Sequence, residues 1–220
     1  HEVHSLATLA QGFFISGKFD QFLSQPFSAP AQSLRQLCQL LLSEPEDTVK
    51  NWQQGILSAL GTDAAALIDV LPEMQALLGQ QAPAPELGPI ESQIRLRHLL
   101  VSLIGAVASP KHPLILFIDD LQWADQPSLD FIAALLQDTH LNGLMLIGAY
   151  RDNEVDPTHP LTIQLRSFEA AGMVVPTLTL GSLALADTTN LVADMLHMPQ
   201  ETIEPLAAVI YTKTGGNPFY

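Results

Sequence analysis

Two short runs of apolar residues limit the possible folds of this chain more than any other feature. Residues 114–118 read LILFI after a turn, and residues 144–150 read LMLIGAY. An unbroken apolar run of this length is typical of a strand buried on both faces, as in a parallel sheet. A helical pattern separates the two runs. The sequence therefore predicts an α/β fold with right-handed crossovers.

Periodicity assigns most of the remaining chain to further strands and helices. GFFIS at 12–16 predicts a third buried strand, and VVPTLTL at 174–180 predicts a fourth, which Pro176 favours at a sheet edge. Residues 31–109 exceed what one crossover needs and predict a helical insertion. The expected helices lie at 2–10, 32–44, 46–60, 63–79 with a break at Pro72, 91–108, 128–138, 161–171, 184–197 and 201–212.

Two acids follow the first apolar run. Asp119 and Asp120 come directly after LILFI, where the carboxyl ends of parallel strands line the ligand crevice of an open sheet. Two carboxylates there can hold Mg²⁺, directly or through water, and can orient an attacking water. The alternative is that both acids only begin the following turn and cap backbone groups.

Other polar residues follow the same strands. Arg151 follows the second apolar run, and a guanidinium at that edge can contact a terminal phosphate. Its alternative is a local ion pair with Asp152 or Glu154. Asp125 is expected to be the N-cap of the next helix. Trp123 fits either packing in the core or stacking on a ligand.

Residues 12–18 match the phosphate-loop spacing G-x-x-x-x-G-K. A working loop needs a strand before it, a helix after it, and a Ser or Thr after the lysine. Here bulky, strand-like residues fill the loop, and Phe19 follows Lys18. We interpret the stretch as a core strand followed by a loop, and expect Lys18→Ala to change little beyond stability. If the stretch is instead a divergent phosphate loop, Lys18→Ala should abolish nucleotide binding.

Charge and cysteine content limit the binding partners and the cellular compartment that we expect. Nine basic and 23 acidic residues give a formal net charge of −14 with neutral histidines, which disfavours nucleic acid and anionic membrane surfaces. The single cysteine, Cys38, lies among leucines and predicts a buried thiol in a cytoplasmic protein. No apolar run approaches the roughly 20 residues of a membrane helix. Because the chain starts at His1 within a helical pattern, we expect a piece of a longer protein.

Five segments together resemble a known family. They read FISGKFDQF, LGPIESQIR, HPLILFIDDLQWAD, LIGAYRDNEVDPTHPL and TGGNPFY. They are similar to the ATPase domain of large bacterial signalling proteins that join a Ser/Thr-kinase-like domain, this ATPase, a GAF domain and a histidine kinase. That domain is similar to the AAA-related STAND class of signal-transduction NTPases. The resemblance covers essentially the whole chain.

The resemblance implies a P-loop-NTPase-like parallel sheet flanked by helices, with ATP and Mg²⁺ as cofactors. It implies that Asp119 is the Walker B aspartate that handles Mg²⁺, that Asp120 polarises water, and that Arg151 is the sensor arginine. Gly216 and Pro218 look like the G-x-P element of a helical lid, with the proline near the base. Taken alone, these two residues fit a loop between helices.

The resemblance also implies a domain organisation. Residues 1–180 would form the nucleotide-binding core, with the helical insertion at about 31–109, and residues 181–220 would begin the lid. The family's first strand and Walker A loop have no counterpart in the 220 residues and are expected just before His1. We therefore expect this fragment to bind nucleotide weakly or not at all.

Two functions remain open. The first is an ATP-binding and hydrolysing switch, in which ATP and Mg²⁺ close the lid and hydrolysis reopens it. Its partners would be the nucleotide and the flanking kinase and sensor domains of the same polypeptide. The second is a degenerate NTPase fold that joins signalling domains as a non-enzymatic scaffold through its helical insertion. Asp120→Asn separates them, because only the switch loses turnover.

Overall fold

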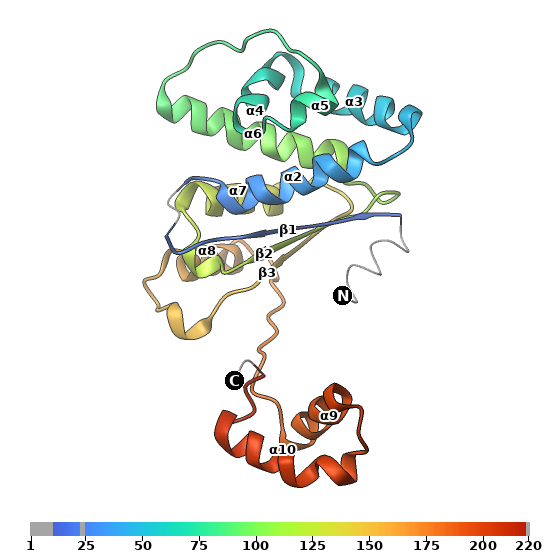
Figure 1. Cartoon of the computed structure of the whole chain (residues 1–220). Helices are drawn as coiled ribbons and strands as arrows, with labels where there is room; N and C mark the ends of the chain where they lie inside the picture. The colour runs from blue at the N-terminus through green and yellow to red at the C-terminus, as the bar shows by residue number, and fades with distance from the viewer. Residues whose placement is uncertain (1–10, 23–24, 219–220) are drawn as a thin grey trace. The chain divides into compact units, whose positions relative to one another are not determined.

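A computed structural model of the chain describes residues 11–22 and 25–218 (Figure 1). The helix predicted at 2–10 lies outside the described residues. The chain divides into two compact units between Met173 and Val174. We describe each unit by itself.

The first unit is built on a parallel sheet of three strands. These are β1 (Phe13–Lys18), β2 (Leu114–Asp119) and β3 (Leu144–Gly148), in the spatial order β1-β2-β3. Ile15 pairs with Leu116, which pairs with Leu146 on its other side. The predicted α/β class with a parallel sheet flanked by helices is confirmed. Because β1 contains the second glycine and the lysine of the G-x-x-x-x-G-K match, that stretch is a strand and not a phosphate loop.

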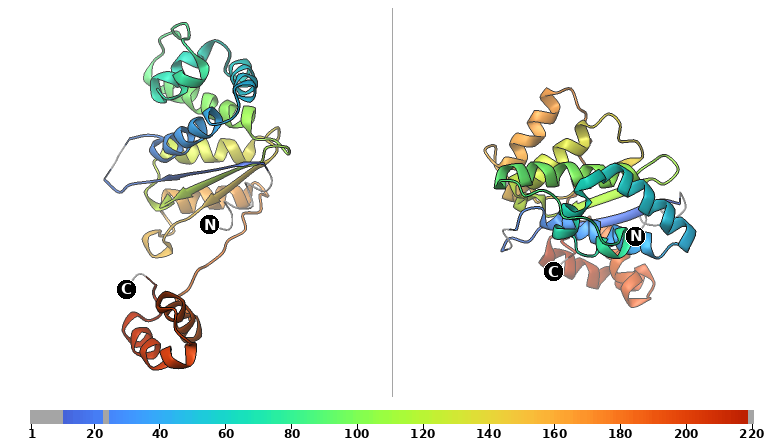
Figure 2. Two further views of the ribbon diagram at one scale, coloured as in Figure 1. Left: turned by 45° about the vertical axis from the view of Figure 1, so that its right-hand side comes forward. Right: turned by 90° about the horizontal axis from the view of Figure 1, so that it is seen from above.

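Helices cover the sheet in two successive layers (Figures 1 and 2). In these views α2 and α7 lie next to the strands, and α3 to α6 lie beyond them on the same side. The helices of this unit are α2 (Ser28–Leu42), α3 (Glu46–Leu60), α4 (Ala64–Val70), α5 (Met74–Leu78), α6 (Pro89–Val107), α7 (Gln126–Gln137) and α8 (Pro160–Ala170), with 3-10 turns at Gly61–Asp63, Leu121–Trp123 and Asp152–Glu154. The segment predicted as an insertion therefore runs from α2 to α6, of which α2 packs directly against β1.

Helix α2 approaches β1 closely because β1 carries a glycine at the contact. A Cβ on Gly17 would lie 2.0 Å from the carbonyl oxygen of Ala29, so only glycine fits there. Side chains of α2 also satisfy the open edge of the strand. The Ser16 N–H donates to Gln36 Oε1 at 2.9 Å, and the Lys18 N–H donates to Gln32 Oε1 at 2.8 Å. The edge of β1 is thereby covered and not left free to pair with another chain.

The hydrophobic core of this unit lies between the sheet and the helices. Its fully buried members include Ile15, Leu34 and Phe131. Cys38 belongs to this core, as predicted, and its thiol donates to the Glu73 carbonyl at 3.3 Å. Burial, with a smaller contribution from the Glu73 charge, raises the pKa of Cys38 to about 11.

The second unit contains two helices, α9 (Leu185–Leu196) and α10 (Gln200–Thr214), which pack against each other. The buried core between them consists of Val192, Ala193, Ile203 and Ala207. The chain after α10 returns to the start of the unit, where the Leu183 N–H donates to the Gly216 carbonyl at 2.8 Å. None of the helices in the described part of the chain has the length and apolarity that a membrane crossing needs.

The strand predicted at 174–180 is wrong. Residues 174–180 have no regular secondary structure and are exposed. The segment has the β-branched composition of a strand, yet the described part of the chain places no strand beside it, and Pro176 removes one backbone donor. Strand propensity without a hydrogen-bonding neighbour does not make a strand.

Candidate functional site

The carboxyl ends of the three strands bring acidic and basic side chains together at one edge of the sheet. Lys18 ends β1 and lies in register with Asp119, which ends β2. Asp120 follows β2, and Arg151 follows β3. We call Lys18, Asp119, Asp120 and Arg151 the rim residues. Three of them were singled out in the sequence, and the parallel sheet places these three together.

The backbone turns sharply at Asp120, which adopts the left-handed conformation with φ 53°. Aspartate tolerates this region better than most residues with a side chain. Its N–H donates to Asp119 Oδ1 at 2.9 Å, and its carbonyl accepts from the Trp123 N–H at 3.0 Å. The turn leaves the side chain of Asp120 only 8% exposed, whereas that of Asp119 is 38% exposed.

Lys18 bridges the two acids. Its Nζ lies 2.9 Å from Asp120 Oδ2 and 3.4 Å from Asp119 Oδ2. The contact with Asp120, followed by the charge of Asp119, holds the pKa of Lys18 above its usual value. The sequence did not predict that this lysine contacts the acid pair. Its position at the end of a strand would have indicated the contact if the pairing of β1 with β2 had been known.

Gln122 is a second residue that sequence reasoning missed. It is buried in the turn after Asp120. Its Nε2 donates to Asp120 Oδ1 at 3.2 Å, and its Oε1 accepts from the Arg151 N–H at 3.3 Å. The side-chain amide therefore connects the acid after β2 to the backbone after β3.

Opposing effects act on the carboxyl of Asp120. Burial acts to raise its pKa, but hydrogen bonds from Lys18 and Gln122 and the charges of Lys18 and Arg151 outweigh burial. The pKa of Asp120 therefore lies below its ordinary value, and the group is a carboxylate at neutral pH. Its Oδ2 is fully buried and, apart from the Lys18 ion pair, has no hydrogen-bond partner.

Arg151 makes the local ion pair that was the alternative to a phosphate contact, and it also approaches Asp120. Its Nη1 lies 2.9 Å from Glu154 Oε1, and its Nε lies 4.0 Å from Asp120 Oδ1. The guanidinium also lies over the ring of Trp123, 5.8 Å from the centroid. The local ion pair is the shorter contact. Because 57% of the side chain is exposed, the guanidinium can reach other groups at the rim.

The donor set at the rim suits a hard divalent cation. Carboxylate oxygens are the ligands that Mg²⁺ takes from proteins, and one or two of them are enough when phosphate oxygens and waters complete the octahedron. Among residues 11–22 and 25–218 there is no group of three or more His, Cys, Asp or Glu side chains that could hold a metal. Asp119 and Asp120 therefore fit a site shared with a ligand and do not form a cage by themselves.

Three other residues were singled out in the sequence, one in the first unit and two in the second. Asp125 is the N-cap of α7, as predicted: its Oδ1 accepts from the Ser128 N–H at 2.8 Å. Gly216 and Pro218 lie in the second unit. A Cβ on Gly216 would meet the Leu183 carbonyl oxygen at 2.1 Å, so this glycine permits a close backbone approach.

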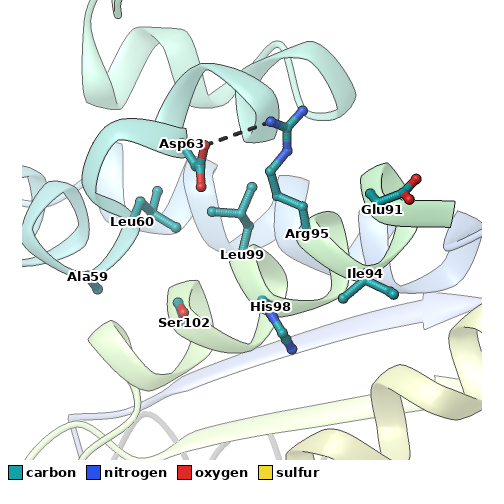
Figure 3. A pocket seen from close by; sticks show the side chains of 9 residues that line it. All are labelled: Ala59, Leu60, Asp63, Glu91, Ile94, Arg95, His98, Leu99 and Ser102. Carbon is teal, nitrogen blue, oxygen red and sulfur yellow. Dashed lines mark ion pairs between the residues drawn. The ribbon is translucent and has the colours of Figure 1, made fainter. Parts of the chain in front are cut away.

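A separate pocket of about 410 Å³ lies in the helical insertion, between the end of α3 and the face of α6 (Figure 3). Arg95 extends along it with Nη1 3.8 Å from Asp63 Oδ1 and 2.7 Å from the Pro85 carbonyl oxygen. Glu91, Ile94 and His98 also line it. The pocket shares no residue with the rim.

Comparisons with known proteins find similarity to one family profile and to two histidine kinases. The sequence profile of the AAA ATPase domain family matches residues 2–147. Hybrid signal transduction histidine kinase G of Dictyostelium discoideum is 25% identical over 94% of this chain, and histidine protein kinase 1 of Candida albicans is 24% identical over 61%. The chain spans only 8% and 6% of the lengths of these relatives. Both relatives are eukaryotic, and a bacterial origin stays a prediction. No solved structure matches the chain.

Proposed function

Because residues 2–147 match its profile, the chain belongs to the AAA ATPase domain family, and we propose that it is the ATP-binding and hydrolysing switch of a signalling protein. The similarity to histidine kinases in two organisms supports the signalling context. In this proposal the partners are flanking kinase and sensor domains of the same polypeptide. We place the nucleotide-binding core at 1–180 and the start of the lid, with Gly216 and Pro218 near the base, at 181–220.

The observation that carries the proposal is the acid pair at the carboxyl edge of the sheet, with a cation from each neighbouring strand. Asp119 is the more accessible acid, and we assign it as the metal ligand. Asp120 is charged, buried and held by Gln122. Its oxygen can accept a hydrogen bond from water and orient that water for attack. Arg151 is exposed enough to reach a terminal phosphate.

Mg²⁺, when bound with nucleotide, would supply positive charge that neutralises the negative charge developing during phosphoryl transfer. The residues of this chain do the remaining work. Asp119 anchors the cation, Asp120 positions the attacking water, and Arg151 responds to the presence or loss of the phosphate. The short contact of Arg151 with Glu154 is the state that the guanidinium returns to after that loss.

The test is ATP turnover by the full-length protein and by its Asp120→Asn and Asp119→Asn variants. Asp120→Asn should lower kcat by about 100-fold or more, because an amide neither carries the charge nor accepts the proton. Asp119→Asn should raise the Mg²⁺ concentration needed for half-maximal turnover by about tenfold.

Asp63→Asn is the matched control for Asp119→Asn. Its side chain is 39% exposed against 38%, and it also forms an ion pair with one basic side chain, Arg95. Turnover should be unchanged in this variant. Wild-type turnover in Asp120→Asn would contradict the proposal.

A non-enzymatic scaffold is the alternative, and two observations favour it. Lys18 and Arg151 already balance the acid pair without any ligand, and the pocket beside Arg95 offers a binding surface away from the rim. A scaffold keeps all its signalling in Asp120→Asn but loses it when the pocket is filled, as by Ser102→Trp. The two variants together separate the functions.

A further inference from the structure

Lys18 makes contacts that its strand does not require. The backbone of this residue is held independently of its side chain, because its N–H donates to Gln32 and the next N–H, of Phe19, donates to the Asp119 carbonyl. The side chain is 59% exposed and could extend into solvent. It instead bends toward the acid pair. The side chain is therefore held by charge and not by packing.

The ammonium lies where it contacts both acids at once. Nζ contacts Oδ2 of Asp120 at 2.9 Å and Oδ2 of Asp119 at 3.4 Å. A divalent cation held by Asp119 would lie beside the same ammonium and compete with it for the charge of the acid pair. Oδ2 of Asp120 has no hydrogen-bond partner besides this ion pair, so the buried carboxylate depends on a cation for compensation.

We propose that Lys18 is an internal counter-ion of the acid pair that competes with the divalent cation held by Asp119. This inference rests on the proposed function, since it concerns the same metal site. Without metal, the ammonium offsets part of the negative charge of the acid pair and stays in contact with both carboxylates. Arrival of the divalent cation displaces the ammonium, which is free to swing into solvent on its flexible stem. Lys18 thereby sets the concentration of divalent cation at which the site fills.

The exposure of Lys18 makes this exchange physically reasonable. The ion pair between Lys18 and Asp119 joins two partly exposed side chains, 59% and 38% exposed, and such a pair contributes only about 0 to 1 kcal/mol to stability in proteins generally. A divalent cation with phosphate and water ligands can therefore replace it. Lys18→Gln keeps a hydrogen-bond donor for the buried oxygen of Asp120, and Arg151 remains 4.0 Å from the same carboxylate, so this substitution should not unfold the chain.

The test measures binding of Mn²⁺ alone to the full 220-residue chain, followed by the EPR signal of the free ion at low ionic strength. Lys18→Gln should bind Mn²⁺ about 3- to 10-fold more tightly than wild type, because the competing charge is gone. Lys18→Arg keeps the charge and should bind within about twofold of wild type. Neither result depends on turnover.

Lys50→Gln is the matched control. Lys50 is 58% exposed, and its Nζ lies 2.7 Å from Glu46 Oε1 on α3. The variant has the same net charge as Lys18→Gln, so any effect of total charge appears in both. Lys50→Gln should bind Mn²⁺ as wild type does.

Equal or weaker Mn²⁺ binding by Lys18→Gln overturns the inference, as does the absence of binding by all variants. If Asp120→Asn still loses turnover in that case, the ATPase proposal stands and only the role of Lys18 fails. If Asp120→Asn keeps full turnover as well, both proposals fail. Tighter binding by Lys18→Gln and Lys50→Gln alike assigns the effect to net charge and also overturns the inference.

Discussion

Asp120 shows at the scale of one residue how a buried charge is kept. Its backbone is left-handed and its side chain is buried, so the carboxylate is largely shielded from water as a hydrogen-bond partner. Lys18 and Gln122 replace that water and hold the group in its charged form. A residue held in this way is suited to chemistry, because burial and pairing fix both its position and its charge.

Burial of the Cys38 thiol should appear in the pH dependence of the free energy of unfolding. Its folded-state pKa of about 11 exceeds the ordinary 9.0. Between these values the unfolded thiol loses its proton while the folded thiol keeps it, so the free energy of unfolding should fall. The loss should reach about 2 kcal/mol near pH 11.

Urea unfolding of wild type and Cys38→Ala at pH 8 and pH 10.5 checks this prediction. Because other groups titrate equally in both proteins, the difference between them isolates the thiol. The advantage of wild type over the variant should shrink as the pH rises. A difference that stays constant would mean that the thiol is more accessible than its burial indicates.

At the scale of an element, α7 shows how the rim is connected to the core. The 3-10 turn Leu121–Trp123 leads from the acid pair to Asp125, which caps the helix. The helix then buries Leu129, Phe131 and Leu135 in the core. The N-cap therefore determines where the turn ends and the helix begins, next to the residues of the site.

Asp125→Ala should destabilise the first unit by about 1 kcal/mol. The change removes the acceptor for the Ser128 N–H at 2.8 Å and for the Ser128 hydroxyl at 2.7 Å. Asp125→Asn keeps an acceptor at the same place and should cost less. Thermal unfolding of both variants measures the difference. Equal midpoints for Asp125→Ala and wild type would show that the cap contributes nothing.

At the scale of the whole molecule, the two units differ in how much core each contains. The first unit has a continuous core that runs from β1 to α8, whereas the described residues of the second include four buried apolar side chains between two helices. Residues 174–182, at the start of the second unit, are exposed throughout and have no regular structure. A unit with so small a core has little stability of its own.

Limited thermolysin digestion should therefore cut first within 174–182, where Val174, Leu178 and Leu180 are each more than 80% exposed. The proline-rich connector at 80–88 is an internal comparison, since it also lacks regular structure. Arg95 holds its Pro85 carbonyl at 2.7 Å. A fragment of about 175 residues should accumulate, as seen by mass spectrometry. First cleavage near Leu87 would contradict this difference.

Much of the fold was predictable because its signals are local. The apolar runs at 114–118 and 144–150 became β2 and β3, and 46–60 became α3 at the predicted bounds. Asp125 was recognised as an N-cap from its neighbours alone. The segment 174–180 failed because a strand needs a partner, and composition does not supply one. Lys18 and Gln122 were missed because their roles lie in contacts with other segments.

The sequence by itself determined the class of the fold and the position of the acids, since periodicity and chain order specify where each strand ends. Only the tertiary structure decided which strand lies beside which. The order β1-β2-β3 brings a lysine 101 residues away in sequence against Asp119. Pairing order depends on long-range packing that no local pattern records. For that reason the acids could be found in the sequence, and their counter-ion could not.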